Sequence, residues 1–322
     1  MTFHTTMKPA AIAALLGSSL LAGPALAQDD YPSRSVEVVH QYGPGGGTDR
    51  FVRAVAQPFE EITGESMVSI SVQGGGGIPA VVNFTQRPAD GHSLMAISPA
   101  QIIAHVQGRI DMADFKPLAR VQYDQALIWV PADSEFETID QFVQHAKDNP
   151  GDLKIALSGA AGFDEITVGL FGLEAEADFG TVPFSSSEMV SNTLGGQVDA
   201  MFEEYGPARG LYDSGDMRPL VVFSEERLPV LEDVPTATEK GWDVTLGRWR
   251  AFAMQAEDSA ENAETLYADI EEAVATESYK KFEEQNALQY RSELLGPDEF
   301  QTFIDGEIET YTTVLRELGY IE

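Results

Sequence analysis

The stretch that decides the fold is HQYGPGGGTD, residues 40–49. It follows residues 36–40, whose valines are typical of a β-strand, and it precedes a segment with helical spacing of its apolar residues. The consecutive glycines at 45–47 leave backbone N–H groups open to close approach by a ligand. Thr48 or Asp49 is suited to cap the following helix, whose N-terminus favours an anion. The stretch therefore predicts a strand-to-helix loop that holds a small carboxylate or phosphate.

A tight turn without a ligand is the alternative interpretation of this loop. Nucleotide binding is disfavoured, because the chain has no G-x-x-x-x-G-K-[ST] motif here and the segment contains no lysine. A dinucleotide fingerprint that began at Gly43 would require glycine at the position of Thr48.

The N-terminus, residues 1–27, resembles a secretory signal peptide. Lys8 supplies the positive region, residues 10–21 the apolar stretch, and residues 25–27 (ALA) a small-x-small cleavage site. No cysteine follows that site, so a lipid anchor is not indicated. We expect a mature chain that begins near Gln28 and is exported to the periplasm.

The composition excludes several classes of function. The chain has no cysteine, which excludes disulfides, thiolate metal sites and cysteine nucleophiles. It carries 52 acidic and 20 basic residues, for a formal net charge of −32 at pH 7. Nucleic acid and anionic membranes are poor partners for such an acidic protein. Adaptation to a saline exterior, where salt screens self-repulsion, is one interpretation of this charge.

Strand and helix signals alternate along the chain. In the first part, strands are predicted at 36–41, 67–73 and 93–97 and helices at 50–63 and 78–86, with a second glycine run at 74–77. Further strands are predicted at 126–130, 154–157, 181–184, 200–203 and 219–223, and helices at 139–149, 164–174, 187–194, 260–285 with a break near Thr276, and 297–318. The fold class is therefore α/β, with two lobes that each contain a mostly parallel sheet and flanking helices.

Five motifs occur in one order: residues 31–34 (YPSR), 43–49 (GPGGGTD), 88–91 (PADG), 194–199 (LGGQVD) and 228–241 (LPVLEDVPTATEKG). Together they resemble the extracytoplasmic solute-binding proteins of tripartite tricarboxylate transporters, the TctC or Bug family. The resemblance extends over essentially the whole mature chain.

The resemblance implies a two-lobed type II periplasmic binding protein, a Venus flytrap, with crossover strands near 123–130 and 248–255. Lobe 1 would comprise residues 28–126 plus 251–322, and lobe 2 residues 127–250. Members of the family bind a small organic carboxylate between the lobes, largely through backbone N–H groups and ordered water rather than through a basic side chain.

By position, the resemblance implies that residues 45–49 hold the carboxylate and that residues 158–162 face them from the other lobe. Phe184, Ser185 and Glu204 would face the distal, variable part of the ligand. The implied ligand-binding residues are Gly45, Gly46, Gly47, Thr48, Asp49, Ser98, Ser158, Gly159, Ala160, Ala161, Gly162, Phe184, Ser185 and Glu204.

The chain departs from the family pattern at three places. Gly43 stands where proline is usual, and the facing loop continues into Asp164 and Glu165 without the usual histidine. Residues 184–187 read FSSS, where the family usually has a tyrosine followed by a basic or small polar residue and glycine. These changes leave the identity of the carboxylate open.

Catalytic signals are weak. The chain has no G-x-S-x-G elbow, no H-x-x-x-H pair and no calcium-loop pattern. Glu203 and Glu204 suit a paired acid and base as in a glycosidase, but adjacent strand residues point to opposite faces. His40, beside the glycine loop, either packs or contacts a ligand. We expect no catalytic residue, no metal, no cofactor and no enzymatic activity.

The leading hypothesis is a monomeric carrier that delivers a carboxylate to the membrane subunits of a tripartite tricarboxylate transporter. The alternatives are an exported hydrolase that uses acidic residues in the cleft, and a sensory ligand-binding subunit that signals through a partner. The missing nucleophile and metal motifs favour the carrier.

Overall fold

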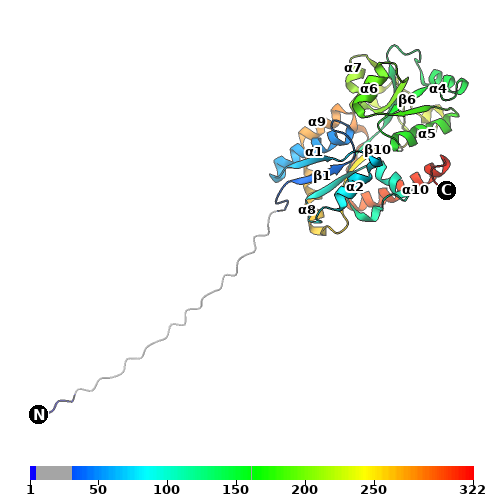
Figure 1. Ribbon diagram of the computed structural model, residues 1–322. Coiled ribbons are helices and arrows are strands. Elements are labelled where there is room, and N and C mark those ends of the chain that lie inside the picture. Colours follow the sequence, from blue (N-terminus) through cyan, green and yellow to red (C-terminus); the bar gives the residue numbers. More distant parts are fainter. Residues whose placement is uncertain (5–30, 161) are drawn as a thin grey trace. The chain divides into compact units, whose positions relative to one another are not determined.

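The computed structural model describes residues 1–4, 31–160 and 162–322. The predicted signal peptide lies almost entirely outside the described residues, and so does Ala161. Contacts within the chain separate Met1–Asp30 from one compact unit, Tyr31–Glu322. The fold and the site described below belong to Tyr31–Glu322 (Figure 1).

The first sheet has the strand order β2-β1-β3-β10-β4. Its strands are β1 (Val36–His40), β2 (Met67–Ser71), β3 (Ser93–Ile97), β4 (Phe115–Asp124) and β10 (Arg248–Gln255). β1 pairs in parallel with β2 and β3, whereas β10 runs antiparallel to β3 and β4.

The second sheet has the strand order β7-β6-β8-β5-β9. Its strands are β5 (Ala126–Pro131), β6 (Lys154–Leu157), β7 (Gly180–Pro183), β8 (Ala200–Glu204) and β9 (Met217–Val222). β6 pairs in parallel with β7 and β8, whereas β5 runs antiparallel to β8 and β9.

The α/β class with two mostly parallel sheets and flanking helices is confirmed, since four of the five strands in each sheet run in the same direction. Each sheet is mixed, because one strand in each (β10 in the first, β5 in the second) runs against both of its neighbours. In each case this is the first strand that the chain forms after it crosses from the other sheet. β5 directly follows β4 of the first sheet, and β10 follows β9, the last strand of the second sheet. A strand that enters in this way is not connected by a right-handed βαβ crossover and is free to run antiparallel.

Helices cover both faces of the first sheet. α1 (Gly47–Thr63) and α8 (Ala260–Ala275) pack on one face, where the core includes Val36 and Val38. α2 (Ile78–Thr85), α3 (Pro99–Val106) and α10 (Pro297–Glu317) cover the other face, together with Val39. The alternation along β1 follows from the two-residue period of a strand.

The second sheet is covered in the same way. α4 (Ile139–Asp148) and α5 (Phe163–Ala175) lie over one face, and α6 (Ser186–Leu194) and α7 (Tyr205–Asp213) over the other. α9 (Glu277–Gln285) contacts α1 and α8. Short 3-10 turns occupy Gly75–Gly77, Met112–Asp114, Pro229–Leu231, Thr238–Lys240 and Leu288–Tyr290.

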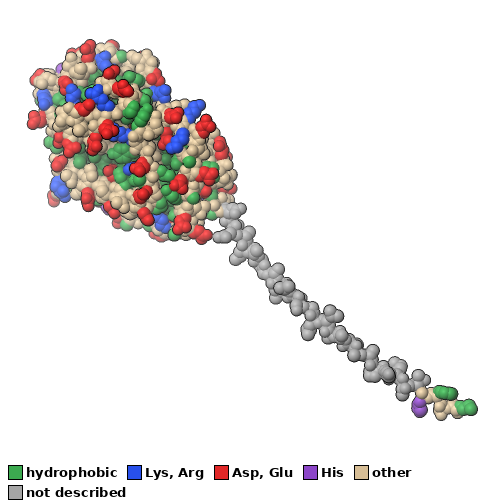
Figure 2. All heavy atoms as spheres, turned by 180° about the vertical axis from the view of Figure 1, so that it is seen from behind, with side chains coloured by type: hydrophobic (Ala, Val, Ile, Leu, Met, Phe, Trp, Pro, Cys, Tyr) green, Lys and Arg blue, Asp and Glu red, His purple; other side chains and the backbone are tan. Residues whose placement is uncertain are grey.

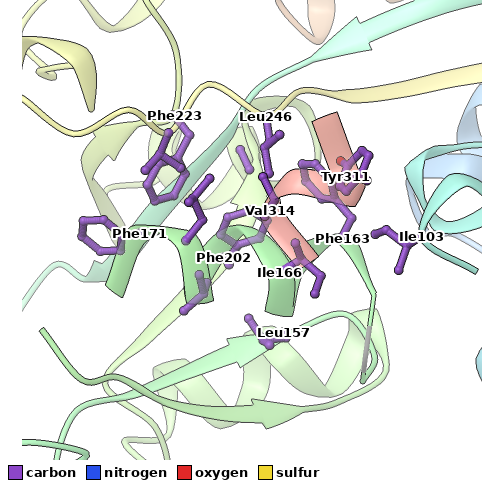
Figure 3. Packing of buried hydrophobic residues seen from close by; sticks show 14 of the residues in the cluster. Ile103, Leu157, Phe163, Ile166, Phe171, Phe202, Phe223, Leu246, Tyr311 and Val314 are labelled. Atoms are coloured by element: carbon purple, nitrogen blue, oxygen red, sulfur yellow. The ribbon is translucent and has the colours of Figure 1, made fainter. Parts of the chain in front are cut away.

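The largest apolar core joins residues of both sheets, and Figure 3 shows part of it. Tyr311 and Val314 of α10 lie beside Phe163 and Ile166 of α5, with Leu246 close by (Figure 3). The C-terminal helix therefore packs on the first sheet through β4 and also contacts α5 of the second.

Several elements were not predicted from the sequence. These are α3, α7 and β4. The predicted break near Thr276 is confirmed, because Thr276 ends α8 and caps the start of α9. The cap of α1 is also corrected: Gly46 occupies the N-cap, and Thr48 and Asp49 lie inside the first turn.

Acidic side chains are scattered over the face shown in Figure 2, with fewer lysines and arginines among them. The acids on this face are exposed to solvent. In the part of the chain that the structure describes, no helix has the length and apolarity to cross a membrane.

We predict that Leu94→Ala lowers the free energy of unfolding by about 2–5 kcal/mol, because Leu94 is fully buried in the middle of β3 and its removal leaves a cavity. Urea unfolding followed by circular dichroism measures this change. The control is Leu173→Ala, whose leucine is 49% exposed on α5 and should alter stability by no more than about 0.5 kcal/mol. Equal effects of the two substitutions would contradict the assignment of β3 to the core.

Candidate ligand-binding site

Two adjoining cavities, of about 260 Å³ and about 310 Å³, lie among loops that follow strands of both sheets. They share the lining residues Gln41, Tyr42, Gly74, Ser158 and Gly159. Loops at the carboxyl ends of strands are the usual ligand site of open α/β sheets. These cavities form the candidate site.

Gln41 and Tyr42 follow β1 directly and are held by neighbouring polar groups. The Oε1 of Gln41 accepts a hydrogen bond from Nε2 of Gln101 (2.8 Å), and the hydroxyl of Tyr42 lies 3.3 Å from Oγ of Ser98. Ser71 donates from Oγ to the carbonyl of Tyr42 (2.7 Å). These bonds fix one wall of both cavities.

The glycine run at 74–77 forms a second wall. All four residues have positive φ, which glycine adopts without strain, and α2 begins at the next residue. A side chain at Gly77 would collide with the amide of Gln41, so the loop and Gln41 are in close contact. Nη2 of Arg109 donates to the carbonyl of Gly75 (3.2 Å) at the exposed edge. Backbone N–H groups at a helix N-terminus make this wall suitable for an anion.

The third wall is the loop that follows β6, and a carboxylate of the protein already occupies both donors of its first residue, Ser158. Oδ2 of Asp164 accepts hydrogen bonds from the backbone N–H of Ser158 (2.7 Å) and from its hydroxyl (2.6 Å). Asp164 lies in the first turn of α5, where a negative charge is favoured. Its other oxygen, Oδ1, pairs with Nη2 of Arg248.

Arg248, the first residue of β10, projects into the smaller cavity and is largely buried. Its guanidinium pairs with Asp164 and Glu204, and its Cζ lies 4.5 Å from the centre of the Phe163 ring. Burial lowers the pKa of Arg248 to about 10, still high enough for a full positive charge at neutral pH.

Arg250 lies two residues further along β10, and its Nη2 is 2.9 Å from Oε2 of Glu204. Gly47 lies against this guanidinium so closely that any side chain at position 47 would collide with it. Burial disfavours the charged form of Arg250, but the carboxylates of Glu204 and Asp124 outweigh it and raise the pKa.

Acidic groups outnumber the two arginines in this cluster. Burial, reinforced by Glu204, raises the pKa of Asp124 to about 7, and the same two causes raise that of Glu203 well above its usual value. Oε1 of Glu203 accepts a hydrogen bond from the backbone N–H of Glu204 (2.9 Å). Among the described residues, no group of three or more histidine or acidic side chains is arranged to hold a metal ion.

The first glycine loop is closed by its own aspartate. Asp49 accepts hydrogen bonds from the N–H of Gly45 (2.9 Å), Oγ of Ser69 (2.7 Å) and Nε of Arg53 (2.9 Å). Burial alone would raise the pKa of Asp49, but these bonds lower it to about 2. His40, fully buried, lies 2.8 Å from Oγ of Ser69 and so packs behind the loop.

The sequence-predicted site residues fall into several groups. Those that line the two cavities of the candidate site are Ser158, Gly159, Ala160, Gly162, Phe184 and Ser185. Gly47 and Glu204 line a third, very small cavity with Arg250. Ala161 lies outside the described residues. Within the described chain, the residues that line none of the three cavities are Gly45, Gly46, Thr48, Asp49 and Ser98.

Sequence reasoning missed Gln41, Tyr42, the 74–77 run and Arg248 as lining residues. The run at 74–77 could have been identified as a binding loop, because it follows a predicted strand just as residues 45–47 do. Arg248 carried no such signal, since its partners Asp164 and Glu204 are distant in the sequence.

Comparison with known proteins decides the family. The sequence model described as the tripartite tricarboxylate transporter family receptor (TctC) matches residues 51–319. The chain belongs to this family. The resemblance found in the five motifs is thereby confirmed.

Curated relatives extend over most of the chain. BugT of Bordetella pertussis is 25% identical over 319 residues, which cover 96% of this chain and 97% of BugT. A protein encoded between tcbD and tcbE in Pseudomonas sp. strain P51 is 29% identical over 257 residues, 77% of this chain and 76% of that relative.

Solved structures show the same fold. MatC of Rhodopseudomonas palustris with bound malate has a TM-score of 0.79 at 22% identity and covers 88% of this chain and 100% of MatC. Rpa4515 of R. palustris with adipate has a TM-score of 0.82 at 23% identity and covers 90% and 99%. At these identities the likeness supports the fold of this family member.

We predict that the free energy of unfolding falls as pH rises from about 4 to about 7, the interval between the ordinary and the raised pKa of Asp124. Over this range the folded chain keeps a proton that the unfolded chain has released, so rising pH favours unfolding. Urea unfolding at a series of pH values measures the slope.

Asp124→Asn should make this slope shallower, because it removes one of the groups that bind the extra proton. Asp213→Asn, at an exposed ion pair with Arg209, is the control and should leave the slope unchanged. A slope that is identical in wild type and Asp124→Asn would show that Asp124 is ionised in the folded protein.

Proposed function

We propose that this receptor captures a small organic carboxylate in the two cavities beside Gln41 and Ser158 and delivers it to a tripartite tricarboxylate transporter. Membership of the receptor family supports the transport role. The observation that carries the ligand class is the meeting of two glycine loops, 74–77 and 158–162, at one small cavity. Backbone N–H groups in such loops bind anions without a dedicated basic side chain.

The proposal includes the mature protein's location and partners. We place it in the periplasm after removal of residues 1–27, as a monomer that meets membrane subunits of its transporter. Related structures with bound ligands support a carboxylate: MatC holds malate and Rpa4515 holds adipate. The proposed division into lobes remains 28–126 plus 251–322 and 127–250. The strands of the two sheets fall on either side of this division, except that β10 of the first sheet begins at Arg248 and β5 of the second sheet begins at Ala126.

A hydrolase that works through acidic cleft residues is less well supported. Glu204, the acid placed best for such a role, is largely buried and paired with Arg248 and Arg250. Its Oε1 is paired with Arg248 and its Oε2 with Arg250, so both oxygens are engaged within the protein. We therefore propose binding without turnover, and we place the sensory alternative second because nothing in the described structure favours it.

To test the cavity, we predict that Ala160→Phe weakens carboxylate binding at least tenfold, or about 1.4 kcal/mol. Ala160 is exposed and lines the cavity of about 260 Å³, so a larger side chain there occupies ligand space without disturbing the core. Calorimetry with a ligand found in a screen of mono-, di- and tricarboxylates measures the change. Ala132→Phe, at an exposed position after β5, is the control. Unchanged affinity in Ala160→Phe would remove this cavity from the proposal.

A second substitution tests the predicted anion seat at residues 45–49. Gly46 is buried, but its extended backbone (φ −68°, ψ 169°) is one that valine adopts readily, so Gly46→Val keeps the backbone conformation and hinders access to the loop; circular dichroism checks that the variant is folded. If this loop holds the carboxylate, affinity falls at least tenfold, since each charge-assisted hydrogen bond contributes about 1.5–3 kcal/mol. Gly306→Val, on α10 with open space around it, is the control. Wild-type affinity in a folded Gly46→Val protein would assign the seat to the 74–77 loop instead.

A further inference from the structure

We propose that Asp164 fills the carboxylate seat of the Ser158 loop and thereby makes this receptor select acids with one carboxylate over dicarboxylates. The inference rests on the proposed function and specifies its ligand class. Asp164 is in this view a specificity-determining residue that acts by occupying a site.

The first step in the argument is the set of donors around Asp164. One oxygen takes a backbone N–H and a hydroxyl from Ser158, and the other takes the guanidinium of Arg248. A loop N–H, a serine hydroxyl and an arginine are the groups that would bind a ligand carboxylate. Because Asp164 lies in the first turn of α5, it also occupies the favourable end of the helix dipole.

The second step is the charge balance behind this seat. Arg248 is shared between Asp164 and Glu204, and Arg250 also pairs with Glu204. The remaining acids of the cluster, Asp124 and Glu203, have a raised pKa. Each is either negatively charged or, when protonated, neutral, so neither supplies a positive charge. Arg248 and Arg250 are thus both paired with carboxylates of the protein, so a second ligand carboxylate at this seat would have to compete with Asp164 and Glu204 for a cation.

The third step is that the opposite wall still offers an anion site. The 74–77 loop lines the cavity with Gly74, Gly76 and Gly77 and leads into α2, and Arg109 lies at its exposed edge. A single carboxylate can bind there and reach across the cavity with an uncharged remainder. Tyr42, Phe163 and Phe184 line the two cavities and provide apolar surface for that remainder.

The test compares pairs of acids of equal chain length in which a terminal methyl group is replaced by a second carboxylate. The shortest pair is acetate and oxalate, and the longest is hexanoate and adipate. Calorimetry at neutral pH measures each member of a pair with the full mature chain. We expect the monocarboxylate to bind at least tenfold more tightly in the pair whose length fits the cavity. A wild-type protein that binds the dicarboxylate as tightly or more tightly would overturn the proposal.

The variant Asp164→Asn keeps the shape of the side chain and an oxygen for Ser158 but removes the charge and frees Arg248 in part. It should shift the ratio of affinities at least tenfold towards the dicarboxylate. Asp164→Glu retains the charge and should keep the preference for the monocarboxylate. Asp213→Asn, which removes one exposed acid, is the control for net charge.

The outcomes separate the two proposals. A ratio that does not move in folded Asp164→Asn overturns the role of Asp164, even if carboxylates bind. If Asp164→Asn does not fold, the wild-type ratio decides. If no mono-, di- or tricarboxylate binds the wild type, the proposed function itself fails.

Discussion

The arrangement of the cleft depends on the burial of two arginines, Arg248 and Arg250, on one strand. A guanidinium that is removed from water must be paired, and breaking a buried pair costs about 3–5 kcal/mol. The partners come from the second sheet, Asp164 from the start of α5 and Glu204 from the end of β8. The ion pairs therefore fix β10 of the first sheet relative to two elements of the second. They also determine which donors of the Ser158 loop remain open.

Much of the fold could be predicted because local signals agreed with the final structure. Glycine loops after apolar strands marked the junctions that follow β1, β2 and β6. α7 escaped because Gly206, Pro207 and Gly210 are helix breakers that tertiary packing tolerates. β10 was expected only through the family resemblance, as the crossover strand near 248–255; its eight residues are all buried, so its burial does not alternate as in a strand with one solvated face. The antiparallel pairing of β5 and β10 depends on connections between distant segments, which sequence periods do not encode.

The candidate site was predictable where backbone chemistry determines it and unpredictable where charge pairing does. Residues 158–160 were expected to line the cleft and do line a cavity. Asp164 was noted only as a departure from the family pattern. The role of Asp164 depends on Arg248, which is distant in the sequence but forms an ion pair with it in the structure. Whether an acid attracts, repels or replaces a ligand is decided by such partners, and a single sequence does not identify them.

The contact between Gly47 and Arg250 has a consequence for how sequences of this type can diverge. No side chain fits at position 47 while the guanidinium of Arg250 is in place. A relative with a larger residue at position 47 must carry a shorter one at position 250, and then Glu204 needs another cation or must itself be replaced. The three positions should change together in evolution, so their combination marks the receptors that share this buried charge cluster.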